Sequence, residues 1–513
     1  MKTPVFDLAI IGGGINGCGI ARDAAGRGLS VFLCEKDDLA GGTSSRSTKL
    51  IHGGLRYLEY YEFRLVREAL HEREVLLNSA PHIIWPLRFI LPHHKGLRPA
   101  WLIRLGLFLY DHIGGRKILP GTTSINLLTD VAGQVLKKNF NTGFEYSDCR
   151  VMDSRLVILN AMDAVAKSAD IRTRTPLLEA NRAGKTWQLK LLDKPGNKEF
   201  QIEAKVLINA SGPWLDKLLN HISHTETKEH IRMVKGSHII VNKLFDHERA
   251  YLFQNADGRI VFAIPYEDEF TLIGTTEGDF HGDPDKVSIS PEEIDYLCKA
   301  ASEYFLREIV KEDVVSSFSG IRPLFDDGRS EAKAATRDYV LKLDAGKDEA
   351  PLLSIYGGKV TTYRKLAESV LTRLSPFLPG MGNEWTEKSF LPGGDFSPND
   401  FDLEVGKLLS RCPVLKKALA TRLFRAYGSC AYEMTAEIKD NSDMGILFGH
   451  NLYGFEVDYL IAHELARSAE DVLWRRTKLG LFLSETQTEA LDSYINKKVL
   501  EEPHSPPIID EEN

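Results

Sequence analysis

Three glycines and one acid near the start of the chain have the spacing of a dinucleotide-binding site. Gly12, Gly14 and Gly17 fit the pattern G-x-G-x-x-G, and Glu35 follows about 20 residues later. In this pattern the first glycine permits a tight turn, the second lets a pyrophosphate approach the backbone, and the third lets a helix pack closely on a strand. The acid then binds a ribose hydroxyl. These residues predict that the chain binds a dinucleotide.

The elements on either side of these glycines must hold them in place. Residues 7–11 and 29–34 are apolar runs that predict strands, and residues 18–27 predict an amphipathic helix between them. Together they form a βαβ unit, in which the N-terminus of the helix, at Ile15 and Asn16, offers free N–H groups to the phosphates. The alternative is a glycine-rich turn in an α/β fold that binds no ligand.

Length and composition are those of a globular protein with about two to four domains. The formal net charge of −8 argues against a dedicated nucleic-acid binder. The six cysteines are scattered and form no C-x-x-C pair, so we expect neither a metal site nor a disulfide framework, and a reducing cytoplasm suits them. The first strand begins almost at once and no apolar run reaches about 20 residues, so we expect no signal or transit peptide and no transmembrane helix.

A second group of candidate contacts follows the βαβ unit. Residues 38–49 are small, polar and rich in hydroxyl groups, which could contact phosphates. Residues 50–58 then place a histidine beside two adjacent glycines, which suggests that the backbone passes close to a flat ligand. The alternative for this second stretch is a glycine turn between two helices. The contacts predicted here are Thr43, Ser44, Ser47, Lys49, His52, Gly53, Gly54 and Leu55.

Motifs along nearly the whole chain carry a family resemblance. They are GGGINGCG at 12–19, TSSRSTKLIHGGLRYLE at 43–59, EFRLVREALHERE at 62–74, FEYSDC at 144–149, KGSHI at 235–239, SGIRPL at 319–324, TRDY at 336–339, GGKVTTYRKLAE at 357–368 and LWRRTKLG at 473–480. With these motifs the sequence resembles the FAD-dependent glycerol-3-phosphate dehydrogenases, membrane-associated respiratory enzymes of bacteria. One departure is Glu277, which stands where we expect aspartate in this family.

The resemblance implies FAD as the cofactor and an α/β fold. That fold is FAD-binding, Rossmann-like and similar to D-amino-acid oxidase, with an inserted antiparallel-sheet substrate domain and a C-terminal helical domain. The expected division is an FAD-binding domain at 1–75, 145–225 and 345–390, a substrate-binding and membrane-facing domain at 76–144 and 226–344, and a helical domain at 396–500. Residues 501–513 are acidic and rich in proline, so we expect a disordered tail.

Two later strand ends join the predicted cofactor site. Residues 206–210 predict a strand that leads to Ser211 and Gly212, which the resemblance implies lie near the cofactor. Residues 351–356 predict another strand, and the glycine turn at 357–362 then opens a helix whose N-terminus can stabilise negative charge on a reduced flavin. The alternative is an ordinary strand-to-helix turn. The contacts predicted in this turn are Gly358, Lys359, Val360 and Thr361.

The implied activity makes three demands on the site. Oxidation of sn-glycerol 3-phosphate to dihydroxyacetone phosphate, with hydride transfer from C2 to flavin N5, requires the protein to position C2, bind a dianionic phosphate and take the hydroxyl proton. Arginine donates to phosphate in pairs, and lysine acts as a point charge. The residues in family motifs that we expect near the substrate are Arg56, Tyr57, Arg322, Arg337 and Lys359.

His238 is the expected proton acceptor, because imidazole titrates near neutrality. His52 is the second candidate and could instead touch the flavin. Arg322 and Lys359 complete the predicted catalytic set, with Lys359 close to the flavin and the substrate hydroxyl. Outside a family motif, these residues would be read as a structural histidine or as surface charges.

Residues 95–117 are the most apolar segment outside the cofactor strands, and they carry basic residues but no acid before Asp111. Basic residues around Trp, Phe, Leu and Tyr suit a helix that lies in a membrane surface. The alternative is a buried core helix. The resemblance implies a peripheral, monotopic protein on the cytoplasmic face of the bacterial cell membrane, a homodimer, and quinone as the electron acceptor.

Three hypotheses about function follow. The first is a glycerol-3-phosphate dehydrogenase that passes electrons to quinone. The second keeps the fold but uses oxygen, as a glycerol-3-phosphate oxidase that makes hydrogen peroxide; the basic apolar segment at 95–117 argues against it. The third is a flavin-binding regulatory protein without enzymatic activity, whose helical domain docks a partner.

Overall fold

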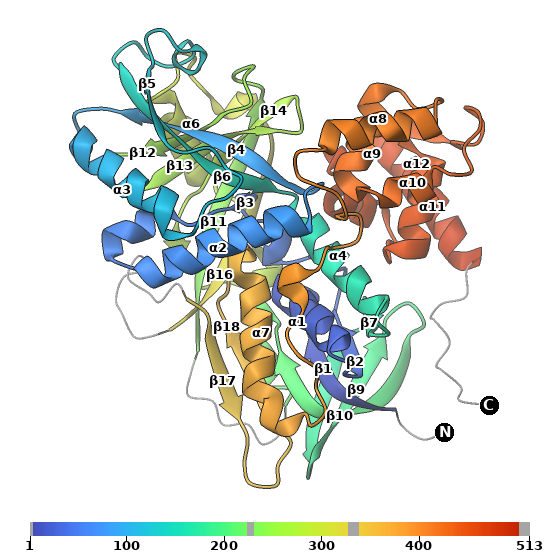
Figure 1. Cartoon of the computed structure of the whole chain (residues 1–513). Helices are drawn as coiled ribbons and strands as arrows, with labels where there is room; N and C mark the ends of the chain where they lie inside the picture. The colour runs from blue at the N-terminus through green and yellow to red at the C-terminus, as the bar shows by residue number, and fades with distance from the viewer. Residues whose placement is uncertain (1–3, 223–229, 327–337, 502–513) are drawn as a thin grey trace.

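The computed structural model describes residues 4–222, 230–326 and 338–501. Two large sheets meet in the centre of the molecule, and a group of helices from the end of the chain packs beside them (Figure 1). The fold class is therefore as predicted. The boundaries of the three domains stay a prediction.

The first sheet is organised around β1 (Val5–Ile11), which pairs in parallel with β2 (Val31–Cys34) and β10 (Lys198–Asn209). Alternate side chains of β1 enter two different core clusters, so the strand is buried on both faces, as is typical of parallel sheets. The order along the sheet is β17-β18-β10-β1-β2-β7, and β9 and β8 extend it from β10. The remaining strands are β7 (Asp170–Arg172), β8 (Leu177–Ala183), β9 (Thr186–Asp193), β17 (Val340–Asp344) and β18 (Leu352–Tyr356).

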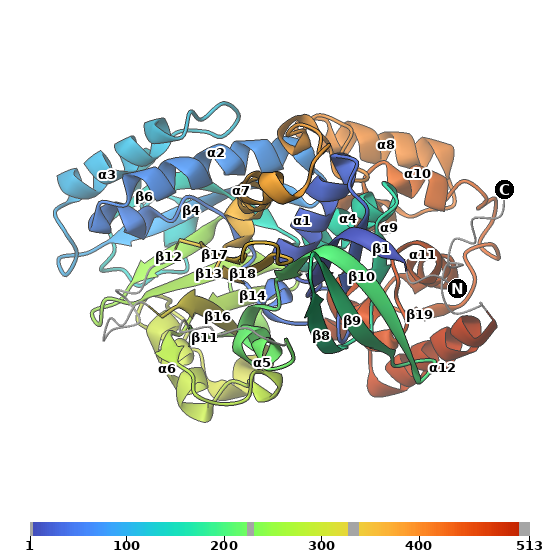
Figure 2. The same ribbon diagram turned by 90° about the horizontal axis from the view of Figure 1, so that it is seen from below.

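The predicted βαβ unit at the N-terminus is confirmed. Its helix, α1 (Ile15–Gly26), begins before the predicted Cys18, because Gly14 is already its extended N-cap residue. Beside it lie α4 (Asp153–Val165) and α7 (Tyr363–Leu374), and the three helices cover one face of the first sheet (Figures 1 and 2).

The helix predicted after the second glycine turn is confirmed, because α7 starts at Tyr363, directly after the predicted turn at 357–362. Gly357 and Gly358 have φ angles of +76° and +99°, which are outside the helical range. A 3-10 turn over Val360–Thr362 separates them from α7. The glycines therefore form a loop at the cavity, and the N-terminus of α7 is one turn away from them.

The second sheet is mixed and mostly antiparallel, with the order β15-β11-β14-β13-β12-β4-β6-β3, to which β16 and β5 are added. Figure 2 shows α6 (Pro291–Ser302) on one side of it, and α2 (Phe63–Ser79) and α3 (Ala100–Ile113) on the other. Its strands are β3 (Leu50–Ile51), β4 (Ile84–His93), β5 (Thr123–Asn126), β6 (Thr142–Val151), β11 (Ile231–Asn242), β12 (Ala250–Gln254), β13 (Ile260–Tyr266), β14 (Phe270–Gly274), β15 (Gly278–Asp279) and β16 (Val314–Phe325).

Helix α3 is not a buried core helix. Of its side chains only Leu107 and Tyr110 are buried, whereas Trp101 is 68% exposed and Phe108 is 56% exposed. The alternative interpretation of residues 95–117 is therefore wrong. Within the three described ranges, no helix combines the length and the hydropathy needed to cross a membrane.

The C-terminal helices have a core of their own, which we call the C-terminal helical group (residues 396–501). Figure 1 shows this group beside α4. The last helix includes Glu501, and the rest of the predicted tail lies outside the described residues. The group's elements are α8 (Phe401–Arg411), α9 (Lys417–Tyr427), α10 (Cys430–Met434), β19 (Leu447–Gly449), β20 (Leu452–Tyr453), α11 (Gly454–His463), a π-helical turn (Asp471–Thr477) and α12 (Glu485–Glu501).

Candidate active site

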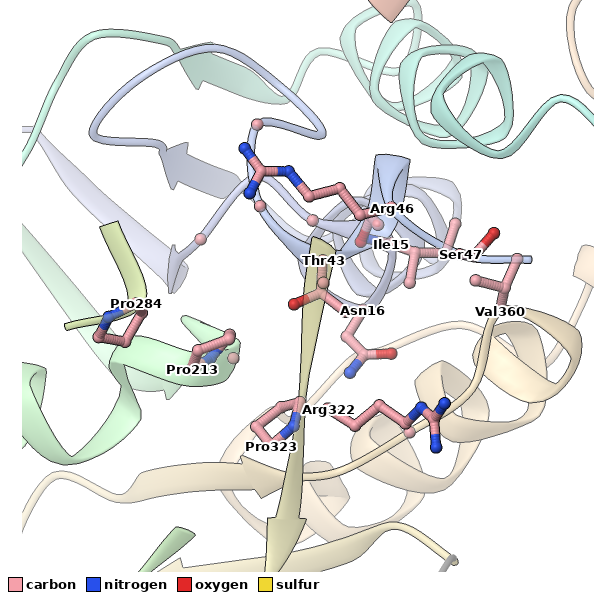
Figure 3. Close-up of a pocket in the computed structure, with 18 of the residues that line it drawn as sticks. Ile15, Asn16, Thr43, Arg46, Ser47, Pro213, Pro284, Arg322, Pro323 and Val360 are labelled. Atoms are coloured by element: carbon pink, nitrogen blue, oxygen red, sulfur yellow. The ribbon is translucent and has the colours of Figure 1, made fainter. Parts of the chain in front are cut away.

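A cavity of about 1060 Å³ lies between the two sheets, where β1 and β10 of the first sheet end next to β11 and β16 of the second. Figure 3 shows side chains from separate elements around it, among them Thr43, Asn16 of α1, and Arg322 of β16. Nearly all the predicted site residues in the described ranges line this cavity. Those that do so are Gly12, Gly14, Ile15, Asn16, Glu35, Thr43, Ser44, Ser47, His52, Gly54, Leu55, Arg56, Tyr57, Ser211, Gly212, His238, Arg322, Gly358, Lys359, Val360 and Thr361.

Three predicted contacts do not line the cavity but support its wall. A Cβ on Gly17 would lie 1.9 Å from the carbonyl oxygen of Gly12, so this glycine serves helix packing. The ammonium of Lys49 is bound to Asp153 at 2.9 Å, and the amide of Gly53 donates to the hydroxyl of Tyr110 at 2.8 Å. A role of Lys49 and Gly53 in direct cofactor contact therefore finds no support here. Arg337 lies outside the described residues.

The glycine turn forms an open cradle at the end of β1. Gly12 has a φ of +118°, and a Cβ there would lie 2.6 Å from the carbonyl oxygen of Ala210, so only glycine fits. At Gly14 an added Cβ would meet only the hydroxyl of Ser44, at 3.1 Å, which leaves room on the cavity side. The cradle thus presents backbone to the cavity, as a bound pyrophosphate requires.

Glu35 stands at the end of β2, as predicted for the acid of a dinucleotide site. Its carboxylate accepts hydrogen bonds from the amides of Gly13, at 2.7 Å, and Asp37, at 3.0 Å. Burial raises the pKa of this carboxyl despite these donors. The acid therefore braces the glycine turn, and its contact with a ribose stays a prediction.

Arg322 and Lys359 are two predicted basic residues that line the cavity. Arg322 is held by Glu277, whose carboxylate oxygen lies 3.2 Å from one guanidinium nitrogen. The ammonium of Lys359 is buried without a hydrogen-bond partner among the described residues and lies 4.1 Å from the ring centroid of Tyr57. A buried, unpartnered ammonium is costly, so its position suits an anionic or hydroxyl-bearing ligand.

His238 is buried on β11 at the floor of the cavity. Its Nε2 lies 3.0 Å from the hydroxyl of Thr48, and its ring stacks on Phe318 with centroids 4.8 Å apart. Burial, followed by the nearby charges of Lys49 and Arg322, lowers its pKa to about 3. The prediction that this imidazole titrates near neutrality is therefore wrong. The ring is neutral at pH 7 and able to accept a proton.

His52 has a different setting from His238. Its backbone amide lies 3.3 Å from the hydroxyl of Thr361, which joins the loop after β3 to the 3-10 turn before α7. Burial lowers the pKa of its imidazole as well. His52 lines the cavity and remains the second candidate for the proton acceptor.

Sequence reasoning missed several residues of this cavity. Arg46, Arg174, Glu277 and Arg475 line it although we assigned none of them a contact. Glu277 and Arg475 stand in or beside motifs that we had noticed, so a signal existed. No sequence signal pointed to Arg174. It lies in the loop after β7, and only the sheet order shows that β7 is next to β2.

Comparison with known proteins decides the family. A family model described as "FAD dependent oxidoreductase" matches residues 7–364, and one described as "C-terminal domain of alpha-glycerophosphate oxidase" matches residues 385–497. A glycerol-3-phosphate dehydrogenase of Pseudomonas aeruginosa is 52% identical over 502 residues, which cover 98% of this chain and 96% of that protein. The chain belongs to the FAD-dependent glycerol-3-phosphate dehydrogenase family.

Other members of this family show the range of its chemistry. The aerobic glycerol-3-phosphate dehydrogenase of Escherichia coli is 48% identical, with 95% of this chain and 97% of that protein covered. A D-erythritol 1-phosphate dehydrogenase of Brucella abortus is 50% identical, with 94% and 96% covered. The structure of a glycerol-3-phosphate dehydrogenase from Bacillus halodurans complexed with FAD superposes with a TM-score of 0.74 at 25% identity, over 96% of this chain and 94% of that one.

Membership of the FAD-dependent glycerol-3-phosphate dehydrogenase family answers two questions that the sequence left open. The cofactor is FAD. The protein is an enzyme, which excludes the non-enzymatic regulatory hypothesis. The open glycine cradle and the unpartnered Lys359 ammonium fit the phosphates and the polar ring of that cofactor.

Proposed function

We propose that this enzyme oxidises sn-glycerol 3-phosphate at C2 to dihydroxyacetone phosphate and passes the electrons to membrane quinone. The observation that carries the proposal is the meeting of Arg322, Lys359 and His238 in one cavity with the glycine cradle. When bound there, FAD supplies an acceptor for the hydride that leaves C2. The names of the relatives support the substrate.

The basic residues have separate tasks in this proposal. The guanidinium of Arg322, oriented by Glu277, binds the dianionic phosphate, and Arg56 joins it from the loop after β3. The ammonium of Lys359 donates to the C2 oxygen and stabilises its developing negative charge. Arg337 is expected to add a second phosphate contact.

His238 takes the proton of the C2 hydroxyl in this proposal. Its low pKa makes it a weak base, because burial and the charges of Lys49 and Arg322 oppose protonation. A bound phosphate dianion offsets the charge of Arg322, so substrate binding should raise the pKa of His238 toward the range of an effective base. Its Nδ1 has no hydrogen-bond partner among the described residues and is free to receive the proton.

A second substrate is favoured by one specific observation. The Brucella abortus relative, named a D-erythritol 1-phosphate dehydrogenase, is 50% identical to this chain over 484 residues. That substrate keeps the phosphate and adds one hydroxyl-bearing carbon. Glu277, longer than the aspartate expected at its position, lies beside Arg322 and so at the phosphate end that the two substrates share in this proposal.

The exposed face of α3 supports peripheral membrane contact and a quinone acceptor. Trp101, Leu105 and Phe108 point to solvent, while Arg98 and Arg104 flank them. An apolar face with basic flanks suits the headgroup region of a membrane surface. The cytoplasmic face of the membrane and the homodimer are parts of this proposal that follow from the resemblance.

An anaerobic titration tests the proposal. Glycerol 3-phosphate should bleach the flavin absorption band, and D-erythritol 1-phosphate should bleach it more slowly. A short-chain quinone should then restore the band faster than oxygen does, whereas the reverse order would favour the oxidase hypothesis. A yellow protein that neither polyol phosphate bleaches would contradict both substrate assignments.

A further inference from the structure

The C-terminal helical group forms part of the wall of the cofactor cavity. Ser468, Glu470, Asp471 and Arg475 line it. Arg475 and Arg476 follow each other in the π-helical turn Asp471–Thr477. This conformation is rare in proteins, but where it occurs it is often at a functional site. None of these residues has a task in the oxidation of the substrate.

Both arginines bind the same carboxylate, that of Asp38 in the loop after β2. The Nε of Arg475 lies 2.5 Å from Oδ2 of Asp38, and Arg476 donates to both oxygens, at 3.0 Å for Oδ1. Asp38 is 3% exposed and Arg476 is fully buried. Asp38 and Arg476 are thus joined by buried, charge-assisted hydrogen bonds, although 438 positions separate them in the sequence.

Arg475 is held in place by further carboxylates. Its other two nitrogens lie 2.7 Å from Glu470 and 2.5 Å from Asp471. Asp471 also binds Arg174, at 2.6 Å, and Arg174 lines the same cavity. Although burial opposes it, the three nearby arginines hold the pKa of Asp471 well below its usual range. Asp471 is therefore ionised, and the cluster connects the C-terminal helical group to the first sheet.

The segment that begins at Asp38 holds the glycine turn. The amide of Ala40 donates to the carbonyl oxygen of Gly13 at 3.0 Å, and the hydroxyl of Ser44 accepts from the amide of Ile15 at 2.9 Å. A Cβ added to Gly13 would lie 2.8 Å from the side chain of Leu39. Residues 38–44 are therefore packed directly against the part of the cavity that faces a pyrophosphate.

We propose that Arg475 and Arg476 are positioning residues of the FAD site, which hold Asp38 so that residues 38–44 keep the glycine turn in its cofactor-retaining shape. If either arginine is lost, the carboxylate of Asp38 becomes a buried charge with fewer partners, and the segment must move to hydrate it. The C-terminal helical group is then part of the FAD site, whatever substrate the enzyme oxidises.

The rate of FAD release from the full-length holoenzyme tests this role. The variants are Arg475→Gln and Asp38→Asn, and the readout is free-flavin fluorescence after dilution at a temperature well below the unfolding midpoint of each protein. We expect both variants to release FAD at least about tenfold faster than the wild type. Residues that hold the ligand-contacting residues in place, without touching the ligand, typically have effects of this size.

Arg422→Met is the matched control. Arg422 of α9 binds both carboxylate oxygens of Glu456 of α11, at 2.8 and 2.6 Å, and Glu456 is fully buried. Neither residue lines the cavity. This variant removes an ion pair inside the C-terminal helical group, so it should lower the unfolding midpoint but release FAD at the wild-type rate.

A more conservative substitution keeps the test decisive if Arg475→Gln and Asp38→Asn do not fold. Arg475→Lys retains the charge but loses the planar fork, and it should release FAD at a rate between those of the wild type and Arg475→Gln. The proposal is overturned if Arg475→Lys and every folded variant of Arg475 and Asp38 release FAD within about twofold of the wild-type rate, or if Arg422→Met accelerates release as much as they do.

Discussion

The hydroxyl of Tyr110 lies 2.8 Å from the backbone nitrogen of Gly53 and joins α3 to the loop that forms one wall of the cavity. The same hydroxyl donates to Asp148, which also binds Arg73 at 2.7 Å. The outer face of this helix is exposed and apolar, and this buried hydrogen bond connects the helix to residues 52–57, most of which line the cavity.

Tyr110→Phe should slow flavin bleaching by glycerol 3-phosphate. The change leaves the amide of Gly53 and one oxygen of Asp148 without a partner, which costs about 1–3 kcal/mol and loosens the loop. Stopped-flow absorbance would measure the bleaching rate, and urea unfolding the stability. Tyr251→Phe is the control, because it loses a buried hydrogen bond to Ala132 but does not line the cavity. Equal bleaching rates in the two variants would refute a positioning role for Tyr110.

His238 makes stability depend on pH in a defined direction. The folded protein holds its imidazole neutral down to a pKa of about 3, whereas the unfolded chain takes up the proton near pH 6.5. Between these values the unfolded state binds more protons, so the free energy of unfolding falls as the pH falls.

His238→Asn removes this pH dependence. From pH 7.5 to pH 5 the wild type should lose about 2 kcal/mol more stability than the variant. Urea unfolding of both proteins at the two pH values measures the difference. Parallel losses in the two proteins would show that the imidazole is not buried in its neutral form. The variant should also bleach about 10²-fold more slowly or worse if His238 is the general base.

Lys359 and Lys49 should respond oppositely to replacement by methionine. The ammonium of Lys359 has no hydrogen-bond partner among the described residues, so Lys359→Met removes an uncompensated charge and should raise the free energy of unfolding by about 1 kcal/mol, while bleaching slows strongly. Lys49→Met leaves the buried carboxylate of Asp153 unpaired and should cost about 3–5 kcal/mol. Urea unfolding and flavin bleaching of each variant measure the two effects. A Lys359→Met variant that is both less stable and fully active would contradict the proposed role.

The exposed face of α3 should decide membrane binding. Changing Trp101 and Phe108 to serine removes two large apolar side chains, each of which contributes up to about 2 kcal/mol when buried, so binding should weaken by roughly tenfold or more. Sedimentation with vesicles of zwitterionic lipid, with and without anionic lipid, measures this. Phe390→Ser, which changes another exposed aromatic residue away from α3, should bind as the wild type does. Unchanged binding of the double variant would place the membrane contact elsewhere.

Local patterns in the sequence determined the parts of the protein that local geometry controls. The G-x-G-x-x-G turn, the strand and helix around it and the acid at Glu35 were predictable because each depends on residues within one βαβ unit. Most of the site residues predicted in the described ranges also line the cavity. The second glycine turn at 357–362 and the start of α7 directly after it were predictable in the same way.

Only the tertiary structure decided how these residues behave. The pKa of His238 follows from its burial and from charges on two distant segments, and no pattern near residue 238 indicates either. Lys49 lies in a small, polar segment that predicted phosphate contacts, but its ammonium is paired with Asp153, 104 residues away. Arg475 reaches Asp38 across 437 positions, because the C-terminal helical group packs against the first sheet. Burial and long-range pairing depend on which elements meet in space, and a one-dimensional pattern does not contain that information.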